Sequence, residues 1–273
     1  MPELPEVETI ARGLRARMVG ARVAAATLLR ASVFHGELEA LAELRGGTIA
    51  GVERGGKYLV IRVRRAGRDW QLMVHLGMSG QLLLGPADAP PLRHTHFTLE
   101  LEDGRMLRFR DPRRFGRLAL AAAPAAGFAA ALGVAAGAEP LEVEAAEFVR
   151  LFSKRSAPIK NALMNQRLLR GLGNIYADES LHRAGLDPRA RTVSGARLRQ
   201  LRLAIRAVLT EAIAAGGSSI SDYVASDGEP GSFHVQHRVY GLSGEPCRRC
   251  RSPIRRIVLA GRSAHFCPRC QRR

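Results

Sequence analysis

Lys57-Tyr58-Leu59-Val60-Ile61-Arg62-Val63 and Trp70-Gln71-Leu72-Met73-Val74-His75-Leu76 are the stretches of this 273-residue sequence that decide its fold. Both are rich in aliphatic and aromatic residues and are typical of β-strands, as are residues 96–101 and 106–109. Glu102-Asp103-Gly104 lies between the last two and favours a hairpin turn. The chain from about residue 20 to residue 120 therefore predicts a β-sandwich or a flattened barrel.

A short amphipathic helix is predicted on the N-terminal side of these strands. Pro5 suits the first turn of a helix, and Val7, Ile10 and Leu14 share one face. If that face is buried, the helix holds the start of the chain in place, whereas chain ends are normally mobile.

Met1-Pro2-Glu3 precedes this helix. Removal of Met1 would leave Pro2 as a terminal secondary amine beside a carboxylate, and an α-amino group is partly unprotonated at neutral pH. Such an amine can act as a nucleophile that forms a Schiff base with a sugar carbon. Taken alone, the tripeptide is better interpreted as an ordinary start of a chain, so the nucleophile hypothesis depends on the features that follow.

Beyond the strands, an Ala-rich segment with several glycines and prolines at residues 119–146 indicates a seam between domains. Apolar residues then recur with a helical period over residues 198–213, up to Gly216-Gly217. Two further helical segments flank Gly171-Leu172-Gly173-Asn174, where Asn174 is a candidate N-cap. The turn before Asn174 could bind a phosphate, although turns of this kind usually only reverse the chain.

All four cysteines lie near the C-terminal end, in Cys247-Arg248-Arg249-Cys250 and Cys267-Pro268-Arg269-Cys270. Two such pairs, 16 residues apart, match one tetrahedral zinc site of four thiolates. A redox role for either pair is the less favoured alternative. Seven arginines lie between the first and last cysteine, which suggests that this hairpin binds phosphates. We therefore predict an α+β chain with four parts: a β-sandwich domain at residues 1–125, a linker at 126–140, a helical domain at 141–236 and a zinc hairpin at 237–273.

The composition indicates a polyanionic partner. Lys and Arg total 42 against 25 acidic residues, which gives a formal charge of +17 and a pI near 11.2. A high Arg content also accompanies GC-rich coding, so charge alone favours nucleic acid only modestly. The sequence has no apolar run of spanning length and no signal segment, so we expect a cytoplasmic, nucleoid-associated protein without membrane contact.

Six ordered motifs together make the chain resemble the formamidopyrimidine-DNA glycosylase family of bacteria. They are Met1-Pro2-Glu3-Leu4-Pro5-Glu6-Val7-Glu8, Gly56-Lys57-Tyr58-Leu59, His75-Leu76-Gly77-Met78-Ser79-Gly80, Asp111-Pro112-Arg113-Arg114-Phe115-Gly116, Gly173-Asn174-Ile175-Tyr176-Ala177-Asp178-Glu179 and the cysteine pairs. The resemblance covers essentially the whole chain. It implies an N-terminal β-sandwich, a helical domain with a helix-two-turn-helix, and a zinc hairpin with one structural Zn²⁺.

The resemblance also implies a monomeric DNA repair enzyme with two activities on double-stranded DNA. It would excise 8-oxoguanine and formamidopyrimidines, and would then cut the strand at the abasic site by β,δ-elimination. Pro2 is the implied nucleophile, Glu3 the acid that protonates the sugar ring oxygen, and Lys57 and Arg262 the proton donors for the eliminations. For Lys57, a plain surface lysine is the alternative. For Glu6, a structural role at the helix start is favoured over catalytic support.

Carried over residue by residue, the resemblance assigns the DNA-contacting groups. Three side chains would fill the space left by a flipped nucleotide: Met78, Arg113 and Phe115. The phosphate contacts implied are His94, Arg113, Arg114, Arg155, Lys160, Asn174 and Arg262, with Tyr240 as a further candidate. Residues 216–233, including Ser218, Ser219 and Tyr223, correspond to the loop that covers the flipped base.

Two positions depart from the family pattern. Asn165 stands where Asp is usual, and Leu242 stands where Arg is common. Two alternatives to the purine-specific enzyme remain at this point: an endonuclease VIII-like glycosylase for oxidised pyrimidines, and a non-catalytic DNA-binding zinc protein.

Overall fold

The structure, a computed structural model, describes residues 1–122, 137–153, 155–218 and 224–273. It divides into two compact units, one comprising Met1–Val134 with Ala215–Ser232 and the other Ala135–Ala214 with Phe233–Arg273. Within the described segments, no helix is both long and apolar enough to cross a membrane. The predicted boundary at residue 125 and most of the predicted linker lie outside the described residues, so the division into four parts stays a prediction.

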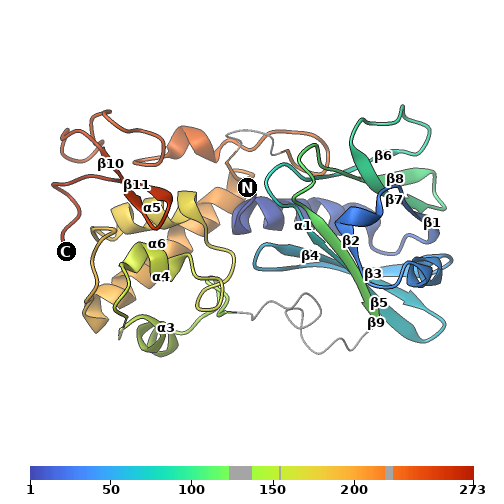
Figure 1. The fold of residues 1–273 in the computed structure, drawn as a ribbon, viewed down its shortest axis with the longest axis horizontal. Helices are drawn as coiled ribbons and strands as arrows, with labels where there is room; N and C mark the ends of the chain where they lie inside the picture. Colours follow the sequence, from blue (N-terminus) through green and yellow to red (C-terminus); the bar gives the residue numbers. More distant parts are fainter. Residues whose placement is uncertain (123–136, 154, 219–223) are drawn as a thin grey trace. The chain divides into compact units, whose positions relative to one another are not determined.

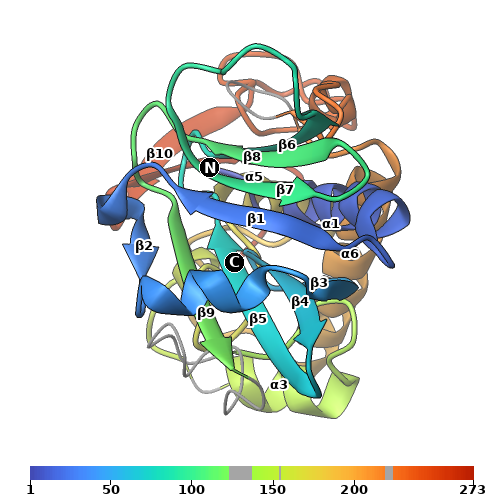
Figure 2. The same cartoon turned by 90° about the vertical axis from the view of Figure 1, so that its right-hand side faces the viewer.

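The first unit contains the predicted β-sandwich, whose two sheets are separate layers in Figure 2. One sheet has the order β1-β7-β8-β6, with β1 (Val23–Leu28), β7 (Thr95–Leu101), β8 (Arg105–Arg110) and β6 (Gln81–Pro86). The other has the order β2-β9-β5-β4-β3, with β2 (Phe34–His35), β9 (Arg117–Ala122), β5 (Arg68–His75), β4 (Tyr58–Arg65) and β3 (Thr48–Gly55). The short β2 runs parallel to β9, and the other paired strands are antiparallel. This unit also contains two 3-10 helices, η1 (Ala31–Val33) and η2 (Glu39–Leu44).

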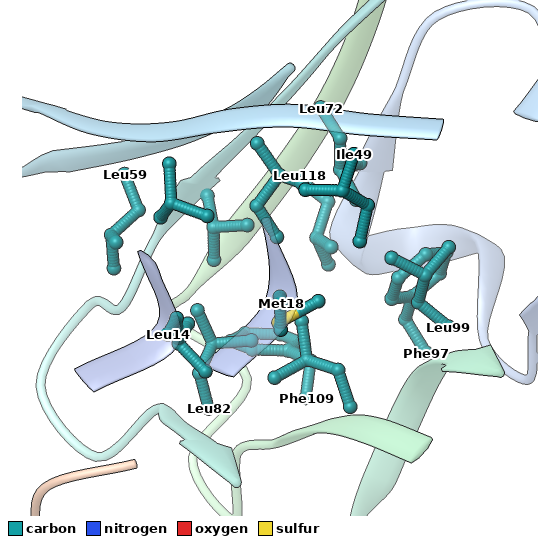
Figure 3. Close-up of a cluster of buried hydrophobic side chains, with 14 of the residues drawn as sticks. Leu14, Met18, Ile49, Leu59, Leu72, Leu82, Phe97, Leu99, Phe109 and Leu118 are labelled. Carbon is teal, nitrogen blue, oxygen red and sulfur yellow. The ribbon is translucent and has the colours of Figure 1, made fainter. Parts of the chain in front are cut away.

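The N-terminal helix α1 (Leu4–Met18) contributes one face to the core of this unit. Val7, Ile10 and Leu14 are fully buried, as their spacing predicts. Figure 3 shows Leu14 and Met18 among buried side chains of both sheets, including Leu82, Phe109 and Leu72. The start of the chain is therefore anchored on the sandwich.

The second unit is built from helices and a two-stranded hairpin (Figure 1). Its helices are α3 (Ala145–Phe152), α4 (Ile159–Leu163), α5 (Asn174–Arg183), α6 (Gly195–Ala214) and the 3-10 helix η3 (Phe233–Gln236). Helix α5 packs on α4, α6 and the hairpin strand β11 (Arg262–Phe266), which pairs with β10 (Arg255–Leu259). The predicted helical segments on either side of residues 171–174 are thus confirmed as α4 and α5.

We expect the substitution Leu99→Ala to destabilise the first unit by about 2 to 5 kcal/mol, because it leaves a cavity at a fully buried position of β7. Trp70, the single tryptophan of the chain, lies in β5 against the same core, so its fluorescence reports unfolding of this unit in urea. Leu29→Ala, at a side chain that is 60% exposed, is the control and should change stability by no more than about 0.5 kcal/mol. Equal effects of the two substitutions would contradict the described core.

Candidate functional site

The first turn of α1 fixes Pro2 and Glu3 within the first unit. Glu3 is the N-cap of α1, and it forms a capping box with Glu6 in which each side chain accepts the backbone N–H of the other residue. The N–H of Glu3 lies 2.7 Å from Glu6 Oε2, and both carboxylates are almost completely buried. Pro2 is buried as well, while Met1 is exposed. The predicted structural role of Glu6 at the helix start is confirmed.

The second carboxylate oxygen of Glu6 binds the beginning of the loop that follows α6. Glu6 Oε1 accepts the backbone N–H of Ser218 at 2.8 Å. Gly217 adopts a positive φ of 84°, and a Cβ there would lie only 2.8 Å from Glu6 Oε1. Glycine is therefore required for this close approach. Ser219 and Tyr223 of the predicted covering loop lie outside the described residues.

Glu8 ties α1 to the end of β3, close to Lys57. Its carboxylate pairs with Arg54 at 2.8 Å and with Arg12 at 2.9 Å. Burial acts to raise the pKa of Glu8, but the hydrogen bonds from the two guanidinium groups outweigh it, so that pKa is lowered. Lys57 lies in the turn between β3 and β4 and is only 7% exposed, so it is not the plain surface lysine considered as the alternative.

Strand register gathers three predicted site segments at one end of the five-stranded sheet. His75, at the end of β5, pairs with Tyr58 at the start of β4 and with Arg117 at the start of β9. The turn that contains Lys57, the loop at 76–80 and the loop at 111–116 therefore lie at the same end of these three strands. Burial, with smaller contributions from the charges of Lys57 and Arg117, lowers the pKa of His75 to about 4, so the imidazole is neutral at pH 7.

The two loops are joined by the buried carboxylate of Asp111. Asp111 Oδ1 accepts the Ser79 hydroxyl at 2.6 Å and the N–H of Arg113 at 3.2 Å, and Oδ2 accepts the N–H of Gly116 at 2.7 Å. At Gly77, where φ is 61°, a Cβ would lie 2.5 Å from the backbone of Phe115 and Gly116. The two loops thus touch backbone to backbone.

The side chains predicted to fill the space left by a flipped nucleotide lie on the outer surface of these loops. Met78 is 41% and Phe115 50% exposed, although large apolar side chains are usually buried. The Arg113 guanidinium stacks on Phe115, with its carbon 5.0 Å from the ring centroid. His94 and Arg114 are exposed and adopt positive φ, and the carbonyl of His94 accepts the N–H of Asp111 at 3.0 Å. The first unit therefore presents Met78, His94, Arg113, Arg114 and Phe115 on connected loops.

In the second unit, Lys160 and Asn174 meet the hairpin strand β11. Lys160 is 1% exposed; its ammonium lies 2.7 Å from Asp178 Oδ1 and donates to the Ser263 carbonyl. Asn174 Nδ2 donates to Ser263 Oγ at 3.2 Å. Asn174 is the first residue of α5 rather than its N-cap, because Gly173 takes the extended N-cap conformation.

The remaining predicted phosphate contacts of this unit lie on three different segments. Arg262 is exposed and follows the two-residue turn Ala260-Gly261, where both residues have positive φ. Arg155 is exposed and donates to the carbonyl of Leu151 at 2.8 Å. Tyr240 is half-buried, and its backbone N–H is held by Glu179 at 2.9 Å.

The four cysteines converge as a metal site requires. Their Sγ atoms all lie within 4.8 Å of one another, at 3.4 Å between Cys250 and Cys267 and 4.0 Å between Cys247 and Cys270. Four sulfurs at about 2.3 Å from a tetrahedral zinc are about 3.8 Å apart, so the observed distances bracket that value. The residues therefore fit one structural Zn²⁺.

Several buried polar residues of the site received no role in the sequence analysis. Ser79 and Asp111 belong to quoted motifs, but nothing in the sequence pairs them across the 32 positions that separate them. Asp178 and Glu179 are adjacent acids in a strongly basic chain, and this contrast was the signal that could have identified them.

We expect Asp111→Asn to loosen the loop at 111–116, because an amide can replace only one of the two accepting oxygens. Hydrogen bonds to a charged group contribute about 1.5 to 3 kcal/mol, so amide exchange at Gly116 should accelerate by roughly tenfold or more. Hydrogen exchange of peptides covering 111–117 measures this. Asp103→Asn, at the exposed β7–β8 turn, is the control, and unchanged protection in Asp111→Asn would contradict the proposed anchoring.

Comparisons with known proteins identify the family of this chain. Three family models match: the formamidopyrimidine-DNA glycosylase N-terminal domain over residues 1–118, its H2TH domain over 134–224, and a zinc finger found in FPG and IleRS over 244–273. The formamidopyrimidine-DNA glycosylase of Dechloromonas aromatica is 47% identical over 278 residues, covering 99% of this chain and 100% of the relative.

Two solved structures of Lactococcus lactis Fpg have the same fold. One, a complex with DNA containing an abasic site, has a TM-score of 0.90 at 36% identity and covers 99% of this chain and 100% of that one. The other, a complex with DNA containing N7-benzyl-Fapy-dG, has a TM-score of 0.90 at 35% identity and covers both chains completely. The chain therefore belongs to the formamidopyrimidine-DNA glycosylase family of DNA repair enzymes.

Proposed function

We propose that this chain excises 8-oxoguanine and formamidopyrimidines from double-stranded DNA and then cleaves the strand at the abasic site. The observation that carries the proposal is the buried capping box of Glu3 and Glu6, which fixes Pro2 at the start of α1 within the first unit. A nucleophile must be held in a defined position, and an anchored helix provides this where a free chain end does not.

Pro2 and Glu3 carry out the first chemical step in this proposal. After removal of Met1, the Pro2 nitrogen attacks C1′ of the damaged nucleotide, and the bond to the base breaks. Glu3 protonates the sugar ring oxygen, so that the bond between C1′ and this oxygen opens and the base departs with the electron pair of its bond to C1′. The iminium that results makes the C2′ proton acidic, and successive eliminations expel the 3′ and 5′ phosphates. Lys57 and Arg262 supply protons during these eliminations.

The loops joined by Asp111 hold the DNA open in this proposal. An enzyme that acts on a base within a duplex must rotate the nucleotide out and fill the gap. The exposed Met78 and Phe115 offer apolar groups for the vacated stack, and Arg113 offers a guanidinium to the orphaned base. Buried contacts of Ser79, Asp111 and Gly116 fix the backbone of the two loops that carry these three side chains.

The phosphates of the DNA are contacted by exposed cations of both units: Arg113, Arg114, Arg155 and Arg262, assisted by His94, Asn174 and Tyr240. We assign Lys160 an indirect role, because its ammonium is buried in the ion pair with Asp178 and supports the strand that begins at Arg262. The substrate also implies action at the nucleoid in the cytoplasm.

Exchange of Glu3 for Gln tests the reaction. Gln retains an oxygen that can accept the N–H of Glu6, so the capping box survives while the acid is lost. We expect cleavage of a duplex with 8-oxoguanine to fall by about 100-fold or more, and affinity for the same duplex to stay within a few-fold. Glu39→Gln, at an exposed position of η2, should cleave like the unaltered chain.

Borohydride should trap a covalent adduct with the lesion duplex in the unaltered chain but not after Pro2 is blocked by retained Met1. Intact mass measurement reports whether Met1 is present. Normal cleavage by Glu3→Gln would favour a catalytic group elsewhere, and an active enzyme that yields no adduct would exclude the Schiff base. A duplex with thymine glycol in the same assay tests the pyrimidine-specific alternative.

Removal of zinc should abolish DNA binding, because the four thiolates hold the hairpin that carries Arg262. A strong chelator is applied, zinc content is measured, and binding is followed by fluorescence anisotropy of a labelled duplex. Trp70 fluorescence should stay unchanged, since that residue lies in the first unit. Chelator saturated with zinc is the control, and full affinity in zinc-free protein would contradict the prediction.

A further inference from the structure

His182 lies beside a zinc-ligating sulfur although it belongs to a different element. It is on the last turn of α5, is completely buried, and its Nε2 is 3.6 Å from Cys247 Sγ. Sulfur is larger than oxygen, so this separation corresponds to a hydrogen bond. Cys247 is equally buried, and the contact is therefore shielded from water.

The chemistry of the sulfur determines where the proton of this contact lies. A cysteine that binds zinc is a thiolate and can only accept a hydrogen bond. The proton must therefore be on Nε2 of His182. A neutral imidazole has one N–H, and Nδ1 of His182 is buried with no hydrogen-bond partner among the described residues. The single N–H of this side chain is thus directed at Cys247.

A second contact runs in the opposite direction between the same two segments. Arg249 stands between the first two cysteines, and its guanidinium donates to the carbonyls of His182 at 3.2 Å and Arg183 at 3.4 Å. These are among the last carbonyls of α5, where a positive charge is favourable. Helix α5 thus donates a hydrogen bond to Cys247 through His182, and Arg249 in turn caps the C-terminal end of α5.

We propose that His182 is a positioning residue of the zinc centre, donating Nε2–H to the bound thiolate of Cys247. Zinc with four thiolates carries a net negative charge, and a buried N–H donor stabilises that charge. The bond has two consequences. It slows loss of zinc and it lowers the reactivity of the Cys247 sulfur. This inference depends on occupancy of the four cysteines by zinc and not on the proposed glycosylase reaction.

Two substitutions separate hydrogen bonding from packing. His182→Phe keeps an aromatic ring but has no donor, whereas His182→Gln keeps an N–H at a similar reach. His237→Phe is the matched control, because His237 is another buried histidine of the same unit. Each purified protein is first checked for one zinc per chain and for its circular dichroism.

Zinc release to a chelating indicator and alkylation of Cys247 by iodoacetamide are then measured. Loss of an outer hydrogen bond typically weakens metal binding by about 10- to 100-fold, so His182→Phe should release zinc at least about tenfold faster and expose Cys247 to faster alkylation. His182→Gln and His237→Phe should remain close to the unaltered chain. Release from His182→Phe at the original rate would overturn the proposal.

The unaltered chain gives an independent test that does not require any variant to fold. With ¹¹³Cd in place of zinc, the Hε2 proton of His182 should couple to the metal through the N–H···S bond, and its Nε2 should show the shift of a protonated nitrogen. An unprotonated Nε2, or absence of the coupling while backbone N–H groups near the sulfurs show theirs, would overturn the proposal. Neither readout involves DNA, so a negative result leaves the proposed catalytic function standing.

Discussion

The burial of two adjacent carboxylates on α5, Asp178 and Glu179, is the constraint around which the second unit is organised. Asp178 pairs with Lys160 at 2.7 Å and accepts the N–H of His265 at 2.8 Å, while Glu179 accepts the N–H groups of residues 238–240. Burial raises the pKa of Glu179, and those N–H donors oppose part of the rise. A buried charge without partners costs several kcal/mol, so the hairpin and the segment before the cysteines have little freedom to lie elsewhere.

The first unit follows the same rule with Glu6 and Asp111. Each is a buried acceptor of backbone N–H groups: Glu6 accepts those of Glu3 and Ser218, and Asp111 accepts those of Arg113 and Gly116. The exposed Arg113 is therefore held at its backbone by an acid that lies beneath it. The protein has a formal charge of +17, and its exposed cations remain available to a polyanion. A few acids are buried instead, where they order the loops.

Local patterns were readable from the sequence, and distant pairings were not. The strands at 57–63 and 70–76, the buried face of α1 and the cysteine spacing were all predicted, because each depends on neighbouring residues. Burial of Lys57 was not readable, since lysine is normally exposed. The contact of Glu6 with Ser218 spans 212 positions, and no local sequence pattern predicts it. The N-cap of α5 was misplaced by one residue because Gly173 can take the extended conformation that the cap needs.

Gly217 shows that the contact between Glu6 and the segment after α6 links residues far apart in the sequence. A side chain at this position would push against the carboxylate of Glu6, which in turn holds the backbone of Glu3. A substitution at Gly217 would therefore affect the first residues of the chain as well. In a genetic screen for loss of repair, alleles at codon 217 would share a phenotype with alleles at codon 6, although the two lie far apart in the gene.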